Sequence, residues 1–281
     1  MRLLPRFKRK KINSAQAPID LATQFPDFDR RTIEIIRKVQ PYTMTSPERI
    51  GALCQSVRYL VNHGIEGAIV ECGVWKGGSM LAAIEVLNEL DASDRQLWLY
   101  DTFDGMTEPG EGDVDYMGQT AQQLLATQSR DDNRSVWCRT KLNEVQTLLK
   151  QSGYPFEKMH FIQGPVEKTL PNQLPPRIAM LRLDTDWYKS TKHELVYLFP
   201  RLVPGGVLII DDYGHWEGCR RAVDEYFRDH QVPILLQRID YTGRIGIKPN
   251  SLEPASRKPE STEASNIERA SSFEINRSIA H

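Results

Sequence analysis

The stretch Ile178-Ala-Met-Leu-Arg-Leu-Asp184-Thr-Asp186 decides the fold, together with Gly206-Val-Leu-Ile-Ile-Asp211-Asp212 further along the chain. In each stretch an apolar run is followed at once by aspartates. Such a run is typical of a strand that is covered on both faces. Two of these strands lying side by side would bring three or four carboxylates together at their carboxyl ends. Because like charges repel, we expect a counter-charge there, and a hard divalent cation with oxygen ligands is the simplest candidate.

An earlier strand runs into a glycine-containing turn. Residues Ala68-Ile-Val-Glu71-Cys-Gly73 predict the strand, Val74-Trp-Lys-Gly77-Gly78-Ser79 the turn, and Met80 to Leu90 a helix. This succession is the nucleotide-binding half of a doubly wound α/β fold. The turn lacks the dinucleotide fingerprint because Trp75 stands at its second glycine, and it lacks a P-loop because Lys76 precedes the glycine pair. A tight structural turn explains the glycines about as well.

The remaining strands complete a sheet of seven. The second strand, Leu97 to Tyr100, ends on Asp101, where a carboxylate can accept hydrogen bonds from ribose hydroxyls. The sequence favours a mostly parallel sheet with helices on both faces and an antiparallel hairpin at the end. The other strands are predicted at 159–162, 178–183, 206–210, 234–240 and 244–248, and helices at 32–39, 46–63 and 219–228.

The chain is predicted to form one domain with two tails. A length of 281 residues with 40% hydrophobic content suffices for one large α/β core, which we place at residues 31–249. Residues 1–30 are expected to be an N-terminal arm, and the Ser-, Glu- and Pro-rich residues 250–281 a disordered tail. Residues 107–153 interrupt the alternation of strands and helices, and either a lid or a helical crossover with a long entry loop accounts for them.

Charge and cysteine usage narrow the class of partner. A formal net charge of -1 argues against nucleic acid or an anionic membrane as the main partner, so a small molecule is expected. No apolar run is long enough to span a bilayer. The four cysteines are scattered without a metal-binding or disulfide pattern, which indicates reduced thiols in a cytoplasmic protein. The helices before Ala68 are placed to form a homodimer contact or to cover the site.

Four motifs in this order resemble those of the macrocin O-methyltransferase family. The resemblance covers residues 40–248 and implies a Rossmann-like class I methyltransferase fold with S-adenosylmethionine and Mg²⁺ as cofactors. It also implies methyl transfer to a hydroxyl of a sugar on a glycosylated natural product or a similar small molecule. The motifs are Glu71-Cys-Gly-Val-Trp-Lys-Gly-Gly, Tyr100-Asp-Thr-Phe-Asp-Gly-Met, Leu183-Asp-Thr-Asp-Trp-Tyr-Lys-Ser-Thr and Gly205-Gly-Val-Leu-Ile-Ile-Asp-Asp-Tyr.

The resemblance further implies where the cofactor binds. The glycine turn would wrap the methionine and ribose parts, Asp101 would hold the ribose, and the residues after the second and third strands, including Gly164, would flank the adenine. The residues assigned to the cofactor in this way are Glu71, Gly73, Trp75, Gly77, Gly78, Ser79, Asp101, Thr102, Phe103, Gly105, Pro165 and Val166.

The chemistry implied by the resemblance depends on the acidic residues. By analogy with metal-dependent methyltransferases, Asp184, Asp211 and Asp212 would be the metal ligands. A cation bound to the acceptor oxygen lowers its pKa and orients it for an in-line displacement. The proton acceptor is expected to be Asp184 or Asp186, with His215 as a weaker candidate.

Two alternatives stay open. A catalytically inactive cofactor-binding or regulatory protein could keep this fold, although the complete acidic set argues against it. The aromatic residues after the acidic motifs suit stacking against a sugar, but they could equally cap the sheet. These residues are Trp187, Tyr188, Tyr213 and Trp216.

Overall fold

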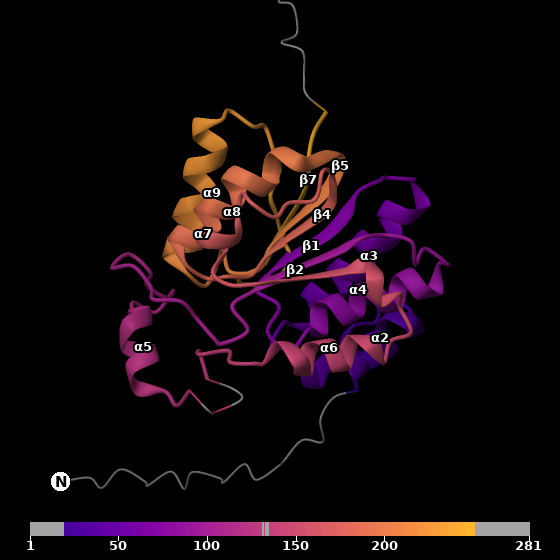
Figure 1. Cartoon of the computed structure of the whole chain (residues 1–281), viewed down its shortest axis with the longest axis horizontal. Coiled ribbons are helices and arrows are strands. Elements are labelled where there is room, and N and C mark those ends of the chain that lie inside the picture. Colours follow the sequence, from indigo (N-terminus) through magenta and orange to yellow (C-terminus); the bar gives the residue numbers. More distant parts are fainter. Residues whose placement is uncertain (1–19, 131, 133–134, 251–281) are drawn as a thin grey trace, which may run out of the picture. The chain divides into compact units, whose positions relative to one another are not determined.

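A seven-stranded sheet forms the centre of the structure (Figure 1). The computed structural model describes residues 20–130, 132 and 135–250. The strand order is β3-β2-β1-β4-β5-β7-β6, and the first five strands in this order are parallel. The strands are β1 (Ala68–Cys72), β2 (Leu97–Asp101), β3 (Met159–Gln163), β4 (Ile178–Leu183), β5 (Leu202–Ile210), β6 (Gln237–Arg238) and β7 (Arg244–Ile247).

The antiparallel hairpin at the end of the sheet is present but shorter than predicted. β7 pairs antiparallel with both β5 and β6, which confirms its place in the topology. The predicted strand 234–240 is reduced to the two residues of β6, both of them exposed. β6 is an edge strand that pairs with β7 at two positions, and the apolar residues before it do not continue the ladder.

Helices cover both faces of the sheet, as the sequence predicts. One apolar core lies between the sheet and α2, α3, α4 and α6, and the second lies between the sheet and α7, α8 and α9 (Figure 1). The helices are α1 (Leu21–Gln24), α2 (Arg30–Val39), α3 (Pro47–Asn62), α4 (Gly78–Glu89), α5 (Ala121–Thr127), α6 (Leu142–Lys150), α7 (Val166–Thr169), α8 (Tyr188–Leu198) and α9 (Glu217–Asp229).

Local sequence explains why these elements form. On β5, Val207 and Ile209 belong to the core beside α3, whereas Leu208 and Ile210 belong to the core beside α8. A strand buried on both faces needs apolar residues at every position, which is why the sequence shows a continuous apolar run. The start of α3 is also as predicted, because the Ser46 side chain accepts a hydrogen bond at the helix N-terminus and Pro47 is the first helical residue.

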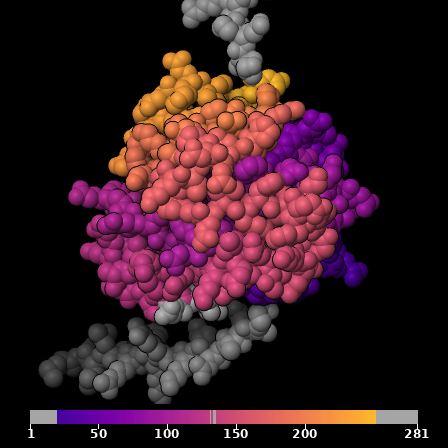
Figure 2. Space-filling model, in the orientation of Figure 1, coloured from indigo at the N-terminus to yellow at the C-terminus, as the bar shows by residue number. Residues whose placement is uncertain are grey.

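The insertion at residues 107–153 divides into two parts. Its C-terminal helix α6 contributes Val145 and Leu149 to the core beside α4, so this part packs as a core helix. Figure 1 shows α5 farther from the sheet than α6, although Ala121 and Leu125 of α5 belong to the apolar core beside α8. In the space-filling view from the same side, the magenta surface of the insertion lies against the orange surface of the C-terminal half (Figure 2). A lid function stays a prediction for the first part.

The ends of the chain extend beyond what the structure describes. The compact unit that contains the sheet ends at Lys248. The predicted disordered tail lies outside the described residues apart from Asn250, and so do residues 1–19 of the predicted arm. The last part of that arm contains α1 and the buried Phe25, whose ring stacks on Phe28 at 5.2 Å. None of the helices in the described ranges combines the length and apolar character needed to cross a bilayer.

Candidate active site

The glycine turn after β1 is in direct contact with the acidic loop after β4. Gly73 has a φ of 83°, and a Cβ atom added to it would lie 1.8 Å from the carbonyl oxygen of Asp184. The backbone N–H of Asp184 donates to the carbonyl of Cys72 at 2.9 Å. Only glycine permits this approach, so the residue type at position 73 brings the two halves of the site together.

Asp101 at the end of β2 holds the glycine turn in place. Its Oδ2 accepts hydrogen bonds from the backbone N–H groups of Val74 (2.7 Å) and Trp75 (2.9 Å), and its Oδ1 accepts one from Phe103 (2.7 Å). Burial raises the pKa of Asp101, while these three hydrogen bonds lower it. The Thr102 hydroxyl also donates to Oδ1 at 3.4 Å, so each oxygen of Asp101 has two donors from the chain itself.

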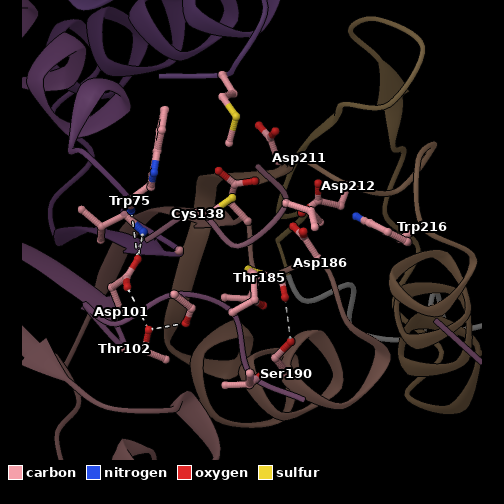
Figure 3. A pocket seen from close by; sticks show the side chains of 18 of the residues that line it. Trp75, Asp101, Thr102, Cys138, Thr185, Asp186, Ser190, Asp211, Asp212 and Trp216 are labelled. Atoms are coloured by element: carbon pink, nitrogen blue, oxygen red, sulfur yellow. Dashed lines mark hydrogen bonds between the residues drawn. The ribbon is translucent and has the colours of Figure 1, made fainter. Parts of the chain in front are cut away.

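Three aspartates converge at the carboxyl ends of β4 and β5. Asp184, Asp186 and Asp212 each offer a carboxylate oxygen, and these oxygens lie within 4.8 Å of one another. Asp186 has a φ of 68°, in the left-handed region, which aspartate tolerates better than most residues. Figure 3 shows Asp186 and Asp212 side by side. The sequence prediction that the acidic motifs meet at one edge of the sheet is therefore correct.

A buried arginine lies beside this cluster. Arg182 on β4 is 3% exposed and contacts Glu71 at 2.8 Å, Asp184 at 2.7 Å and Asp211 at 2.7 Å. A second arginine, Arg49 of α3, also pairs with Asp211. Part of the counter-charge that the sequence led us to expect from a cation thus comes from the protein. Of the predicted metal ligands, Asp184 and Asp212 lie in the cluster, and Asp211 lies between two guanidinium groups.

Sequence reasoning missed Arg182, although one signal was available. It lies in an apolar run whose other members are all buried, so its side chain had to be buried as well. The register of the sheet places it opposite Glu71 of β1. A buried arginine requires an acidic partner, and Glu71 is the one acidic residue within β1.

Burial and mutual repulsion change the acidity of the cluster. Burial, followed by the charge of Asp184, raises the pKa of Asp186 to about 7. Burial, followed by the charge of Asp186, raises the pKa of Asp212 well above its ordinary value. The Oδ2 atom of Asp212 is buried and has no hydrogen-bond partner among the described residues. The donor set therefore consists of crowded carboxylates with an unpaired oxygen, which fits a divalent cation.

A cavity of about 530 Å³ connects the glycine turn to the acidic cluster. Looking into it, Trp75 and Asp101 lie on one side and Asp186, Asp212 and Trp216 on the other (Figure 3). The predicted site residues that line it are Gly73, Trp75, Ser79, Asp101, Thr102, Gly105, Pro165, Val166, Asp184, Asp186, Asp211, Asp212 and His215.

Four predicted cofactor residues do not line this cavity. Phe103 is buried in the core beside α4, which departs from its predicted place next to the adenine. Glu71 is turned toward Arg182, and burial raises its pKa to about 8. Gly77 and Gly78 shape the turn from behind: a Cβ atom on Gly78 would lie 2.5 Å from the carbonyl oxygen of Tyr42.

His215 lies in the same cavity as the acidic cluster, as predicted. Its backbone N–H donates to the carbonyl of Asp212 at 3.0 Å, and its Nδ1 lies 3.1 Å from the hydroxyl of Tyr241. Burial lowers the pKa of His215. Its imidazole is therefore neutral near pH 7, and its role as a base stays a prediction.

The aromatic residues after the acidic motifs were predicted either to stack against a sugar or to cap the sheet, and they differ in position. Among the described residues, Trp216 lines the cavity and Trp187, Tyr188 and Tyr213 do not. Trp187 is fully buried, its Nε1 donates to the carbonyl of Thr107 at 3.1 Å, and its ring packs edge-on against Trp216 at 4.9 Å. Trp187 is thus a packing residue.

The first part of the insertion is attached to both acidic loops. Asp113 is buried, and its Oδ1 accepts a hydrogen bond from the backbone N–H of Tyr188, the first residue of α8, at 2.8 Å. Asp115 forms a backbone bridge with Trp216, and Glu217 donates to the carbonyl of Val114 at 2.9 Å. Composition alone gave no sign of these contacts.

The buried carboxyl group of Glu194 contacts the loop after β4. Glu194 of α8 is 0% exposed, and its Oε1 accepts a hydrogen bond from the Thr185 hydroxyl at 2.9 Å. Its Oε2 is buried without a partner among the described residues. Burial raises the pKa of Glu194 to about 8, so this side chain is largely protonated at neutral pH.

Comparison with known proteins gives the family. The model of the macrocin O-methyltransferase (TylF) family matches residues 6–245. A protein of Streptomyces olivaceus, 8-demethyl-8-(2,3-dimethoxy-α-L-rhamnosyl)-tetracenomycin-C 4′-O-methyltransferase, is 31% identical over 234 residues, which cover 82% of this chain and 86% of that protein. Mycinamicin III 3″-O-methyltransferase of Micromonospora griseorubida is 33% identical over 202 residues, covering 72% and 76%.

Solved structures agree with this result. The O-methyltransferase NovP superposes with a TM-score of 0.65 at 29% identity, over 74% of this chain and 83% of that one. The calicheamicin methyltransferase CalS11, at 15% identity and a TM-score of 0.53, shares the fold. The order of the four motifs, the strand order and the family match together show that the chain is an O-methyltransferase that belongs to the macrocin O-methyltransferase family.

Proposed function

We propose that this enzyme transfers the methyl group of S-adenosylmethionine to a hydroxyl of a sugar on a glycosylated small molecule, with assistance from Mg²⁺. The contact between Gly73 and Asp184 carries the proposal, because it places a nucleotide-type turn and an acidic cluster in one cavity. The relative from S. olivaceus is named for a rhamnosyl-tetracenomycin, which supports a sugar hydroxyl as the acceptor.

The chain's own residues would hold the cofactor as follows. Asp101 fixes the turn at Val74 and Trp75 and lines the cavity, where a ribose hydroxyl could donate to its carboxylate. Pro165 and Val166 would form the apolar wall for the adenine. S-adenosylmethionine supplies an electrophilic methyl group when it is bound. A methyl transfer of this kind requires the acceptor oxygen to be held close and aligned, which the enclosed cavity favours.

We further propose that Asp184, Asp211 and Asp212 hold the metal and that Asp186 accepts the proton. A divalent cation held at this place would lower the pKa of the acceptor hydroxyl. For Asp211 to be a ligand, Arg49 has to leave its carboxylate. Asp186 is preferred over Asp184 as the base because Asp184 already accepts a hydrogen bond from Arg182. A proton acceptor must be within hydrogen-bond reach of the hydroxyl, and Asp186 lines the cavity.

Calorimetric titration with S-adenosylmethionine, with and without MgCl₂, tests the first step. We expect a single cofactor site that persists without the metal, because the residues of the turn do not include the acidic cluster. Turnover is then followed as a mass increase of one methyl group on glycosides. A chain that binds no cofactor would refute the proposed function, and one that binds it without methylating any glycoside would favour the inactive alternative.

A further inference from the structure

The backbone that carries the acidic residues after β4 is strained. The backbone N–H of Trp187 donates to the carbonyl of Thr185 at 2.8 Å, which closes a three-residue turn with Asp186 at its centre. The φ of Asp186 is 68°. Turns of this kind with a positive φ are rare and strained, and they persist where the surrounding structure holds them. We refer to residues 184–187 as the acidic turn, and the groups that hold its ends decide where the carboxylate of Asp186 lies.

Two of the anchors of the acidic turn lie outside α8. The backbone N–H of Asp184 donates to the carbonyl of Cys72 on β1 at 2.9 Å. At the other end, the indole of Trp187 is buried, and its Nε1 donates to the carbonyl of Thr107 at 3.1 Å. The middle of the turn, at Thr185, is held from α8.

Two side chains of α8 hold Thr185. The hydroxyl of Ser190 donates to the carbonyl of Thr185 at 3.2 Å (Figure 3), but it also lies 3.1 Å from the carbonyl of Trp187 and is shared between them. The hydroxyl of Thr185 donates to Oε1 of Glu194 at 2.9 Å. Because Ser190 and Glu194 are four positions apart, they lie on one face of the helix. The bond to Glu194 is the one that fixes the side chain of Thr185.

The burial of Glu194 calls for an explanation. Its side chain is 0% exposed, and Oε2 has no hydrogen-bond partner among the described residues. Burying a carboxyl group with an unpaired oxygen costs free energy, and an apolar side chain would fill the same place in the core without that cost. The hydrogen bond from Thr185 is what an apolar residue could not accept.

The protonation of Glu194 suits this contact. Burial raises its pKa to about 8, so the carboxyl group is largely neutral near pH 7. A neutral acid accepts the hydrogen bond from Thr185 without adding a further negative charge beneath the aspartates of the cluster. The amide of glutamine, which is also neutral and has a carbonyl oxygen, could take its place.

Thr185 connects this buried contact to the chemistry. It lines the cavity and is joined through the backbone to Asp184 on one side and Asp186 on the other, whereas Glu194 does not line the cavity. A shift of Thr185 would therefore move both carboxylates at once. Displacements of about 1 Å at a reacting group can lower a rate about a hundredfold, so small changes here are sufficient to matter.

We propose that Glu194 is a positioning residue for methyl transfer. Through the Thr185 hydroxyl it holds the acidic turn in the geometry in which Asp184 reaches the metal and Asp186 reaches the acceptor hydroxyl. This inference rests on the proposed function and deepens it, because it adds a residue that contacts none of the reacting groups.

Calorimetric titration with MgCl₂ tests the proposal without requiring an acceptor. The full chain is saturated with S-adenosylhomocysteine before the metal is added. Thr185→Val removes the donor and Glu194→Leu the acceptor, and each should weaken Mg²⁺ binding about tenfold, as the loss of groups behind metal ligands does. The double variant should bind Mg²⁺ no more weakly than either single variant, because both substitutions break the same bond.

Conservative variants should restore the metal site. Thr185→Ser keeps a hydroxyl donor and Glu194→Gln keeps an oxygen acceptor, so both should bind Mg²⁺ within about twofold of the wild type. Should Glu194→Leu fail to fold, the comparison of Thr185→Val with Thr185→Ser decides the question. Titration of each variant with S-adenosylmethionine shows whether the cofactor half is intact.

A matched control separates positioning from a loss of stability. The hydroxyl of Thr32 in α2 donates to the carboxylate of Asp29 at 2.9 Å, the same length as the bond from Thr185 to Glu194. Thr32 is buried and does not line the cavity. Thr32→Val should therefore lower the melting temperature and leave Mg²⁺ binding as in the wild type.

The outcomes distinguish this inference from the proposed function. Wild-type Mg²⁺ affinity in Thr185→Val or Glu194→Leu, additive losses in the double variant, or a Glu194→Gln variant as impaired as Glu194→Leu would each overturn the role of Glu194. The proposed function stands in these cases if the wild type binds S-adenosylmethionine and Mg²⁺. A wild type that binds S-adenosylmethionine but no Mg²⁺ would refute both the metal assistance and the role of Glu194.

Discussion

The guanidinium of Arg182 lies 2.7 Å from the carboxylate of Asp184, so the first aspartate of the acidic cluster has a protein counter-charge of its own. The same guanidinium reaches Glu71 of β1 and Asp211 after β5. Arg182 therefore joins three neighbouring strands at the edge of the sheet where the cavity opens. These ion pairs should stabilise the folded protein, and substitution of Arg182 can test this.

Arg182→Met should destabilise the fold by about 3–5 kcal/mol, because it leaves buried carboxylates without their partner. Arg182→Lys keeps the positive charge but cannot contact three carboxylates from one planar group, so it should lose less. Urea unfolding monitored by circular dichroism measures both variants. If Arg182→Met were as stable as the wild type, the ion pairs would have no net role in folding.

The proposed metal ligands can be separated from the proposed base by calorimetry with MgCl₂. We expect Asp184→Asn, Asp211→Asn and Asp212→Asn each to weaken Mg²⁺ binding more than tenfold, since even residues behind the ligands contribute tenfold or more. Asp186→Asn should weaken Mg²⁺ binding less than any of these three variants and should lose turnover. If Asp186→Asn lost Mg²⁺ binding and Asp211→Asn kept it, Asp186 would be the ligand in place of Asp211. Asp211 would then remain paired with Arg49.

Gly73→Ala should be severely disruptive, because the added methyl group would lie 1.8 Å from a backbone oxygen in addition to the cost of a positive φ. Gly153→Ala is a matched control. It has a φ of 76° but no atom within 4 Å of the added Cβ, so it should cost only about 1 kcal/mol. Thermal unfolding and S-adenosylmethionine titration of the two variants check this. Equal effects would show that the approach of the two loops is not tight.

The raised pKa of Glu194 predicts that the free energy of unfolding depends on pH. Burial raises its pKa from 4.5 to about 8, so the folded state binds more protons than the unfolded state between these values. Its contribution to stability is therefore fully present below about pH 4.5 and is lost as the pH rises toward 8. Glu194→Gln should reduce the loss of stability between pH 5.5 and pH 8.5 in urea unfolding.

The exposed Glu157 provides the control for this experiment, since Glu157→Gln should leave the pH profile as in the wild type. A Glu194→Gln profile that falls as steeply as that of the wild type would mean that other groups set the pH dependence. Glu71, whose pKa burial also raises to about 8, would be the next residue to substitute.

The fold could be predicted because its determinants are local and ordered. Each central strand shows an apolar run of its own, and Ser46 with Pro47 marks the start of α3. Parallel strands then place their carboxyl ends at one edge, so the meeting of the acidic motifs follows from their order along the chain. The hairpin was predicted too long because periodicity does not show where an edge strand stops pairing.

Partners within the site could not be predicted in the same way. Arg182 stands 111 residues from Glu71, and Asp113 stands 75 residues from Tyr188. The apolar run around Arg182 indicates that this arginine is buried, but no local pattern indicates its partner or that of Asp113. Phe103 was assigned with its whole motif, and the structure places its side chain in the core beside α4. The residue types indicated that a carboxylate site was present, but only the packing shows which groups form ion pairs and hydrogen bonds with one another.

The carboxylate of Asp113 has a consequence for exchanging parts between relatives. A Cβ atom at position 218 would lie 1.9 Å from Asp113 Oδ1, so Asp113 can keep this position only if residue 218 is glycine. A chimaera that moves residues 107–119 of this chain into another member of the family therefore needs a glycine at the position that matches 218. Substrate range in these enzymes would then be recombined in coordinated blocks and not loop by loop.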